Sequence, residues 1–204
     1  AKTAADEIVN IINDVSATIR PLYEEFVEHP SYPEDMFVTS GEAKEMIDDT
    51  SMVIVVDTNR PGMTECPELL GMTRTIVVFD HHRQSSDNID NALLSYIEPY
   101  ASSACEMVSE VLQYITDDVK IPAVEANSLY AGIVIDTNNF MNKTGVRTFE
   151  AAAFLRRCGA DIPFARKMLR DDMKSYQAKA GIISIAEVYR DRFAIARGEN
   201  LHIE

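Results

Sequence analysis

The residues best suited to chemistry in this sequence lie at the end of one apolar run, Arg74 to Arg83, RTIVVFDHHR. The run is rich in β-branched and aromatic residues and ends in Asp80, His81 and His82. Burying three titratable groups together costs free energy unless they are paired or bind a ligand. In open α/β sheets, ligands bind in the crevice beyond the carboxyl ends of the strands. The pattern therefore predicts a metal site at the end of this strand.

Two further acids end apolar segments elsewhere in the chain. Asp57 closes SMVIVVD, and Asp136 closes the helical pattern AVEANSLYAGIVIDT. Carboxylate and imidazole donors together suit Mn²⁺ better than a structural Zn²⁺ site, which prefers cysteine and histidine. Spaced carboxylates can also bridge two ions about 3.5–4 Å apart. An aspartate at a strand end is often only a turn residue, so neither acid identifies a site without the cluster at residues 80–82.

The two apolar runs begin about 23 residues apart and predict a βαβ unit of a parallel sheet. Their near-continuous apolar character predicts strands that are buried on both faces. In that arrangement both terminal acids converge on one edge of the sheet. Further strands are expected at residues 8–12, 36–38 and 92–97.

Helical spacing of apolar residues and capping residues predict the elements that surround this sheet. Ser16 and Ser40 are expected to cap the first two helices, and Ser103 with Glu106 forms a capping-box pattern. Helices are predicted at residues 17–29, 40–47, 68–71, 103–115, 123–137, 149–158, 162–169 and 173–186, and a hairpin or a strand at 187–197. The fold class is therefore α/β, a parallel-stranded sheet flanked by helices.

Composition narrows the setting. The chain has 204 residues and a net charge of -14, which suits one domain and argues against binding a nucleic-acid duplex. A phosphate substrate is still allowed, because bound divalent cations invert the local field. The cysteines Cys66, Cys105 and Cys158 form no C-x-x-C pair, which indicates a reducing, cytoplasmic setting. No apolar run approaches the roughly 20 residues that span a bilayer.

Several motifs resemble one family. VVFDHHR resembles the signature motif of the DHH phosphoesterase superfamily, VVDTNRP its second motif and LYAGIVIDT its fourth. EPYASSACEMVSEVLQYI and TGVRTFEAAAFLRRCGAD resemble the cyclic-di-AMP phosphodiesterases of the GdpP type, and the similarity runs over about residues 8 to 198. The resemblance implies a Mn²⁺-dependent phosphodiesterase with two ions that hydrolyses cyclic-di-AMP to a linear dinucleotide.

The resemblance also implies a role for each candidate metal ligand. Asp57 would bridge the two Mn²⁺ ions, and His81 and Asp136 would complete the shell of one of them. The remaining three candidates, Asp80, His82 and Arg83, would act in catalysis. Asp80 would orient the imidazole from behind the ligands, and His82, with Arg83 as a weaker candidate, would face the scissile phosphate.

Two family motifs are not found in the sequence. The first is a histidine followed by two spaced aspartates, expected just before the helix tail at residues 1–6. The second is the glycine-rich, histidine-containing motif of the associated C-terminal substrate-binding subdomain. We therefore expect residues 1–190 to be an N-terminally truncated DHH domain that lacks its first strand-helix motif, and residues 191–204 to begin a linker. Such a chain would bind one metal ion weakly and be inactive alone.

Alternatives remain within and outside this enzyme class. The same motifs serve hydrolysis of short oligonucleotides, of 3′-phosphoadenosine compounds and of pyrophosphate. A non-catalytic nucleotide sensor on the same fold is a further alternative, although it would have no need of Asp57, His81 and Asp136. The resemblance also suggests a homodimer and a parent protein tethered to the membrane through other segments.

Overall fold

A three-stranded parallel sheet lies at the centre of the computed structural model, which describes residues 9–16, 19–115, 120–169 and 173–197. The strands β3 (Met52–Val56), β4 (Thr75–Asp80) and β5 (Leu94–Ile97) lie side by side in that order. A separate parallel pair is formed by β1 (Asn10–Ile11) and β2 (Phe37–Val38). The predicted α/β class and the predicted parallel sheet are confirmed.

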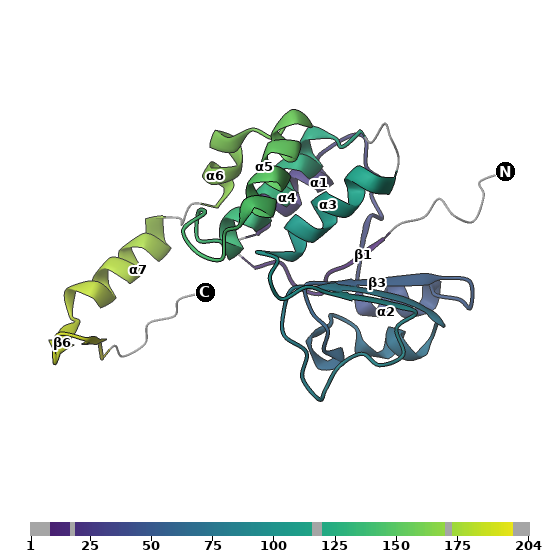
Figure 1. The fold of residues 1–204 in the computed structure, drawn as a ribbon, viewed down its shortest axis with the longest axis horizontal. Coiled ribbons are helices and arrows are strands. Elements are labelled where there is room, and N and C mark those ends of the chain that lie inside the picture. The colour runs from purple at the N-terminus through teal and green to yellow at the C-terminus, as the bar shows by residue number, and fades with distance from the viewer. Residues whose placement is uncertain (1–8, 17–18, 116–119, 170–172, 198–204) are drawn as a thin grey trace.

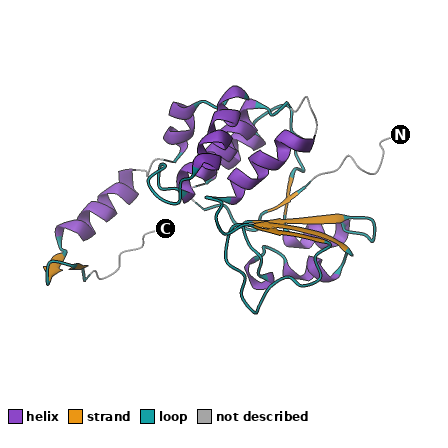
Figure 2. Cartoon of the chain, viewed as in Figure 1, coloured by secondary structure: helices purple, strands orange, loops and turns teal. Residues whose placement is uncertain are grey.

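Helices lie on two sides of the sheet (Figures 1 and 2). The larger group packs together above the sheet and consists of α1 (Arg20–Val27), α3 (Ala104–Ile115), α4 (Ala123–Asp136), α5 (Val146–Arg157) and α6 (Ile162–Met168). On the other side lie α2 (Ser40–Met46) and two 3₁₀ turns, Pro61–Met63 and Pro67–Gly71.

The main core lies inside the larger helical group. Helix α4 is apolar on several sides, and its Ile133 is completely buried together with Leu155 of α5. Helix α5 ends where Gly159 takes a φ of 106°, a left-handed conformation that suits glycine. Asp136, the last residue of α4, therefore follows closely after core residues of that helix, Ile133 and Val134.

The sheet has one buried face. On β4, Ile76, Val78 and Asp80 are at most 1% exposed, and Ile76 and Val78 pack in one cluster with Leu70 of the second 3₁₀ turn. The prediction that both strands are buried on both faces is wrong for β3, where Ile54 and Val56 are 58% and 51% exposed. Side chains alternate between faces along a strand. An apolar run alone does not say whether a second layer covers the other face.

Two predicted helix caps differ in the structure. Thr39, and not Ser40, caps α2, because its hydroxyl accepts from Glu42 N while the Glu42 carboxylate accepts from Thr39 N at 2.8 Å. This is a complete capping box one residue earlier than expected. Helix α1 follows Ile19 with no side-chain cap, so Ser16 does not cap it.

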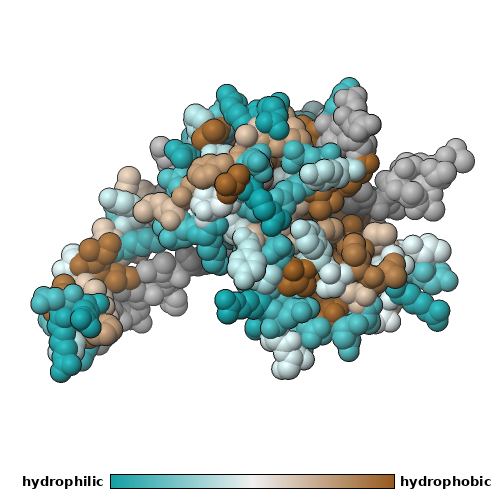
Figure 3. All heavy atoms as spheres, viewed as in Figure 1, coloured by the Kyte–Doolittle hydropathy of each residue, from teal (hydrophilic) through white to brown (hydrophobic). Residues whose placement is uncertain are grey.

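The last described elements form an arm that extends from the helical group (Figure 1). It consists of α7 (Met173–Ser184) and an antiparallel hairpin of β6 (Glu187–Tyr189) and β7 (Phe193–Ile195). The predicted helix is confirmed, and of the two alternatives for residues 187–197 the hairpin is the one present. Figure 3 shows apolar surface on this arm. The predicted domain boundary at residue 190 falls in the turn of the hairpin and stays a prediction.

The helix tail predicted at residues 1–6 lies outside the described residues. Within the described residues, no helix is both long enough and apolar enough to pass through a bilayer.

Candidate metal and catalytic site

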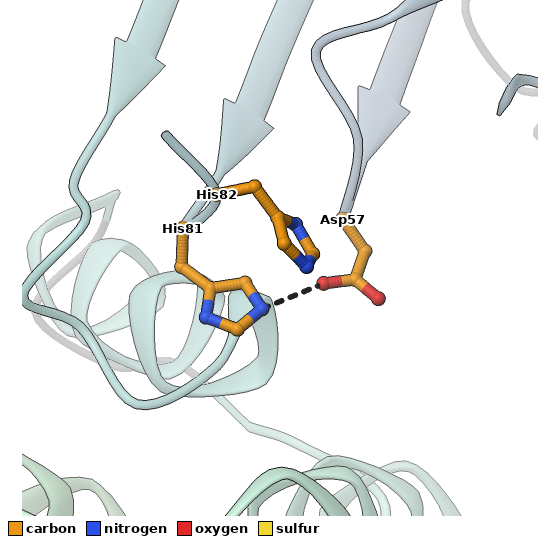
Figure 4. Close-up of side chains that lie close together, drawn as sticks. All are labelled: Asp57, His81 and His82. Carbon is orange, nitrogen blue, oxygen red and sulfur yellow. Dashed lines mark ion pairs between the residues drawn. The ribbon is translucent and has the colours of Figure 1, made fainter. Parts of the chain in front are cut away.

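The parallel pairing of β3 and β4 brings together the residues that follow each strand. Val56 pairs with Phe79 in the register, and Asp57 N donates to Phe79 O at 2.9 Å. Just beyond this point, His81 Nε2 lies 3.2 Å from Asp57 Oδ1 (Figure 4). The predicted convergence of two strand ends is therefore present.

The two residues of this contact differ in backbone and exposure. Asp57 has a φ of 65°, a left-handed conformation that is uncommon outside glycine and is tolerated best by aspartate and asparagine. Its side chain is 57% exposed, whereas that of His81 is 5% exposed. The imidazole is thus held in the protein while the carboxylate opens toward solvent, which is the arrangement of a site that a ligand can reach.

Asp136 enters the site from the end of α4. Its Oδ2 lies 3.8 Å from His81 Nε2. Burial raises the pKa of Asp136 above the ordinary value and the negative charge of Asp57 raises it further, although His81 and Lys143 act in the opposite direction. Two carboxylates crowded beside one imidazole repel each other, and a bound cation relieves that repulsion.

Asp80 points to the other face of the sheet and orients the imidazole of His82, not that of His81. It is completely buried, and its Oδ1 lies 2.7 Å from His82 Nδ1 and accepts from His82 N at 3.1 Å. Asn59 Nδ2 donates to the second oxygen of Asp80 at 2.5 Å. With Nδ1 paired to a carboxylate, His82 has its Nε2 available for a metal ion or a substrate.

Three side chains form a group that could hold a metal ion. One donor atom each from Asp57, His81 and His82 lies within 4.8 Å of the others, and the two imidazole rings are 4.3 Å apart (Figure 4). Asp136 adjoins this group through His81. The donors are oxygen and imidazole nitrogen with no thiolate, a set that fits Mn²⁺ and related divalent ions. The residues present therefore fit a metal site, and His82 lies among its donors.

The role expected for Arg83 stays a prediction, and Asn59 is a residue that the sequence reading did not expect at the site. Arg83 is exposed, and within the described residues no hydrogen bond or ion pair ties it to the site. Asn59 was missed, although it is 2% exposed and its Oδ1 has no hydrogen-bond partner among the described residues. The available signal was its place two residues after Asp57 at a strand end, where a polar residue must meet another polar group.

Known proteins resemble this chain over most of its length. The model of the family described as "DHH family, N-terminal domain" matches residues 4–133. Cyclic-di-AMP phosphodiesterase PdeA of Listeria monocytogenes is 39% identical over 184 residues, which cover 90% of this chain and 28% of the relative. Cyclic-di-AMP phosphodiesterase GdpP of Bacillus subtilis is 42% identical over 160 residues, which cover 78% and 24%. The chain thus spans about a quarter of each relative.

One solved structure shows the same fold. An exopolyphosphatase-related protein from Bacteroides fragilis superposes with a TM-score of 0.66 at 18% identity, covering 82% of this chain and 51% of that protein. At this sequence identity the match supports a shared fold only. The chemistry of this chain has to be argued from the residues of its own site.

Proposed function

The chain belongs to the DHH family, and on that premise we propose that it contributes to a metal-dependent phosphodiesterase that hydrolyses cyclic-di-AMP to a linear dinucleotide. The observation that carries this proposal is the meeting of His81 with Asp57 at 3.2 Å and with Asp136 at 3.8 Å. The names of the two relatives, both cyclic-di-AMP phosphodiesterases, support the choice of substrate.

We propose that Asp57, His81 and Asp136 hold Mn²⁺, with Asp57 as the residue shared by two ions in the complete enzyme. Bound there, the ions would supply a water activated near neutral pH and would offset the charge that develops on the phosphate. Asp57 suits the shared position because its carboxylate is exposed and only one of its two oxygens lies beside His81 Nε2. His81 suits a fixed position because its side chain is buried and lies beside both acids.

The second set of residues acts on the phosphate in this proposal. The pair of Asp80 and His82 keeps one imidazole orientation, so His82 presents Nε2 toward the group formed with Asp57. From there it either joins the ligands or donates to a phosphate oxygen. Arg83, which is exposed beside His82, would add positive charge that stabilises the negative charge of the phosphate.

Other features of the proposal concern the whole protein. The relatives extend well beyond the matched region, so a substrate-binding subdomain, homodimer formation, a membrane tether and a cytoplasmic catalytic domain all belong to the proposal. The same assay separates the alternatives. Short oligonucleotides, 3′-phosphoadenosine and pyrophosphate are offered as competing substrates, and a pure sensor would bind cyclic-di-AMP without turnover.

The test is turnover of cyclic-di-AMP by the full-length protein with and without Mn²⁺, with the products separated by chromatography. We expect a linear dinucleotide to appear only when the metal is present. Binding without hydrolysis would favour the sensor, and faster turnover of another phosphate ester would replace the substrate. The same assay on the 204-residue chain tests the expectation that this part is inactive alone.

A further inference from the structure

A second hollow lies at the same carboxyl edge of the sheet as the metal site. It has a volume of about 660 Å³ and is lined by aromatic rings and one cation, including Tyr100, Phe140, Lys143 and Phe149. These residues come from two segments, the stretch after β5 and the stretch from the end of α4 into α5. None of the four belongs to the metal site itself.

Both segments are continuous with site residues. On one side, Glu98 N donates to Asp80 O at 2.9 Å, and the chain continues directly to Tyr100. On the other side, Thr137 follows Asp136 and is completely buried. Thr137 Oγ1 accepts from Phe140 N at 2.9 Å, so the aromatic loop is fixed to the residue beside a metal ligand.

The loop that carries the rings holds an unusual backbone. Asn138, Asn139, Phe140 and Lys143 have φ values of 46°, 60°, 64° and 50°. Left-handed conformations at residues other than glycine cost free energy, and they tend to persist where a binding site uses the resulting shape. Here the shape directs Phe140 inward, where its ring lies 5.9 Å from that of Tyr130.

The anchored Phe140 supports an exposed aromatic surface. The ring of Phe149 stacks on it with centroids 5.7 Å apart and planes 13° from parallel. Phe149 is nevertheless 58% exposed, and Tyr100 is 93% exposed. Phe149, held by Phe140 and open to solvent, and the exposed ring of Tyr100 beside the same hollow are suited to stack against a planar ligand.

Another hollow, lined in part by Tyr96, Glu110 and Arg147, is less suited to bind an anionic ligand. The Arg147 guanidinium there already binds the Glu110 carboxylate through two nitrogens, at 2.7 and 2.6 Å. Its charge is therefore used within the protein. Lys143, by contrast, is exposed at the edge of the aromatic hollow.

Building on the proposed function, we propose that the aromatic hollow binds one nucleoside of the dinucleotide, with the base stacked against Tyr100 and Phe149 and Lys143 facing a phosphate. Stacking on aromatic rings tolerates every base because each has a π face. This subsite would therefore contribute affinity for a nucleotide and would not distinguish adenine from other bases. The chemistry recognised is a planar base joined to an anionic phosphate.

The test measures KM and kcat for cyclic-di-AMP with Mn²⁺ and the full-length protein. Tyr100→Ala and Phe149→Ala are each expected to raise KM at least about fivefold, the lower bound for loss of one stacking contact. We expect kcat to stay nearly unchanged in both of these variants. Phe149→Tyr keeps a ring and should restore most of the affinity. The matched control is Tyr114→Ala, which removes an 89% exposed tyrosine from α3 outside the hollow and should change neither constant.

The outcomes separate this proposal from the one it rests on. Unchanged KM in Tyr100→Ala and Phe149→Ala, with normal wild-type turnover, overturns the subsite and leaves the phosphodiesterase proposal standing. If the wild-type protein shows no turnover, the phosphodiesterase proposal fails, and calorimetric titration with AMP and with ribose 5-phosphate decides the subsite. Preference for AMP that both variants lose supports the subsite, whereas no preference overturns it.

Discussion

His81 Nε2 and Asp57 Oδ1 lie 3.2 Å apart although they follow different strands. The contact exists because β3 and β4 are parallel neighbours whose carboxyl ends meet at one edge. It joins a buried imidazole to an exposed carboxylate, and Asp136 adds a second acid 3.8 Å from the same nitrogen. Two carboxylates beside one imidazole favour a bound cation, which would offset their negative charge.

Replacement of Asp57 tests the metal assignment directly. Asp57→Asn keeps the size of the side chain and removes its charge, so Mn²⁺ affinity and the turnover of cyclic-di-AMP should both be lost. A metal that binds only the folded state stabilises it, by about 2.7 kcal/mol at a hundredfold excess over Kd. We therefore expect Mn²⁺ to raise the Tm of the wild-type protein and to have little effect on the variant.

Asp49→Asn is the matched control for that experiment. Asp49 is also exposed, but it precedes β3, whereas Asp57 follows the strand. At about 3.3 Å per residue, the two acids lie at opposite ends of the strand. The control should keep the Mn²⁺-dependent rise in Tm, and equal responses from both variants would remove Asp57 from the metal site.

Replacement of Asp80 tests the orientation of His82. Asp80→Asn removes the carboxylate that lies 2.7 Å from His82 Nδ1, so the imidazole loses its fixed tautomer. Changes of this kind behind a metal ligand cost roughly 10–100-fold in affinity or activity. Titration with Mn²⁺ and steady-state kinetics measure both quantities. If both stay at wild-type values while the variant folds normally, the pair has no role in the site.

The sequence predicted that the site residues meet at one edge of the sheet, but it did not predict which side chains contact each other there. Two apolar runs ending in acids, linked by a short connection, have few arrangements other than adjacent parallel strands, so the meeting of Asp57 with His81 could be foreseen. The partner of Asp80 could not. Alternation along β4 sends Asp80 to the buried face, but the chain leaves the strand after it, and the turn decides that His82 folds back onto Asp80.

The sequence pattern also could not predict which face of a strand is covered by other parts of the protein. The run at β3 is apolar on both faces, yet Ile54 is 58% exposed, whereas Val55 on the opposite face is buried in one cluster with Leu70 of the second 3₁₀ turn. Thr39 competes with Ser40 for the same cap, and both are good capping residues. Glu42 lies three residues after Thr39 in the sequence, which is the capping-box spacing, so this signal was present and the prediction overlooked it.

Arg147 joins three elements that surround the site, and its replacement should affect stability. Its guanidinium binds Glu110 of α3 at 2.7 and 2.6 Å and lies 3.6 Å from Glu98 after β5. Arg147→Lys keeps the charge and loses the two-pronged geometry. Because Arg147 is 40% exposed, we expect a loss of about 1 kcal/mol or less in the free energy of unfolding.

A double-mutant cycle with Glu110→Gln, followed by urea unfolding, measures that coupling. The two single variants should each lose stability, and the double variant should lose less than their sum. The coupling should also weaken at high salt, since the pair is partly exposed. Additive losses at low salt would show that the two side chains do not stabilise each other.

Gly132 sets the distance between α3 and α4, and its replacement by alanine should disturb both stability and the site. A Cβ added at Gly132 would lie 2.3 Å from Cys105 Sγ and 3.3 Å from Cys105 Cβ, so the two helices must separate or the thiol must turn. Overpacking of this kind costs about 1–3 kcal/mol, more than the roughly 1 kcal/mol that alanine gains over glycine in a helix. Gly132 lies one turn before Asp136, so the same shift moves that carboxylate away from His81.

We expect Gly132→Ala to lower Tm and Mn²⁺ affinity together, and Cys105→Ala in the same chain to restore much of both. Gly181→Ala in α7, where an added Cβ meets nothing within 4 Å, should leave both unchanged or raise Tm slightly. A Gly132→Ala variant with wild-type Tm would show that the helices accommodate the added carbon without moving Asp136.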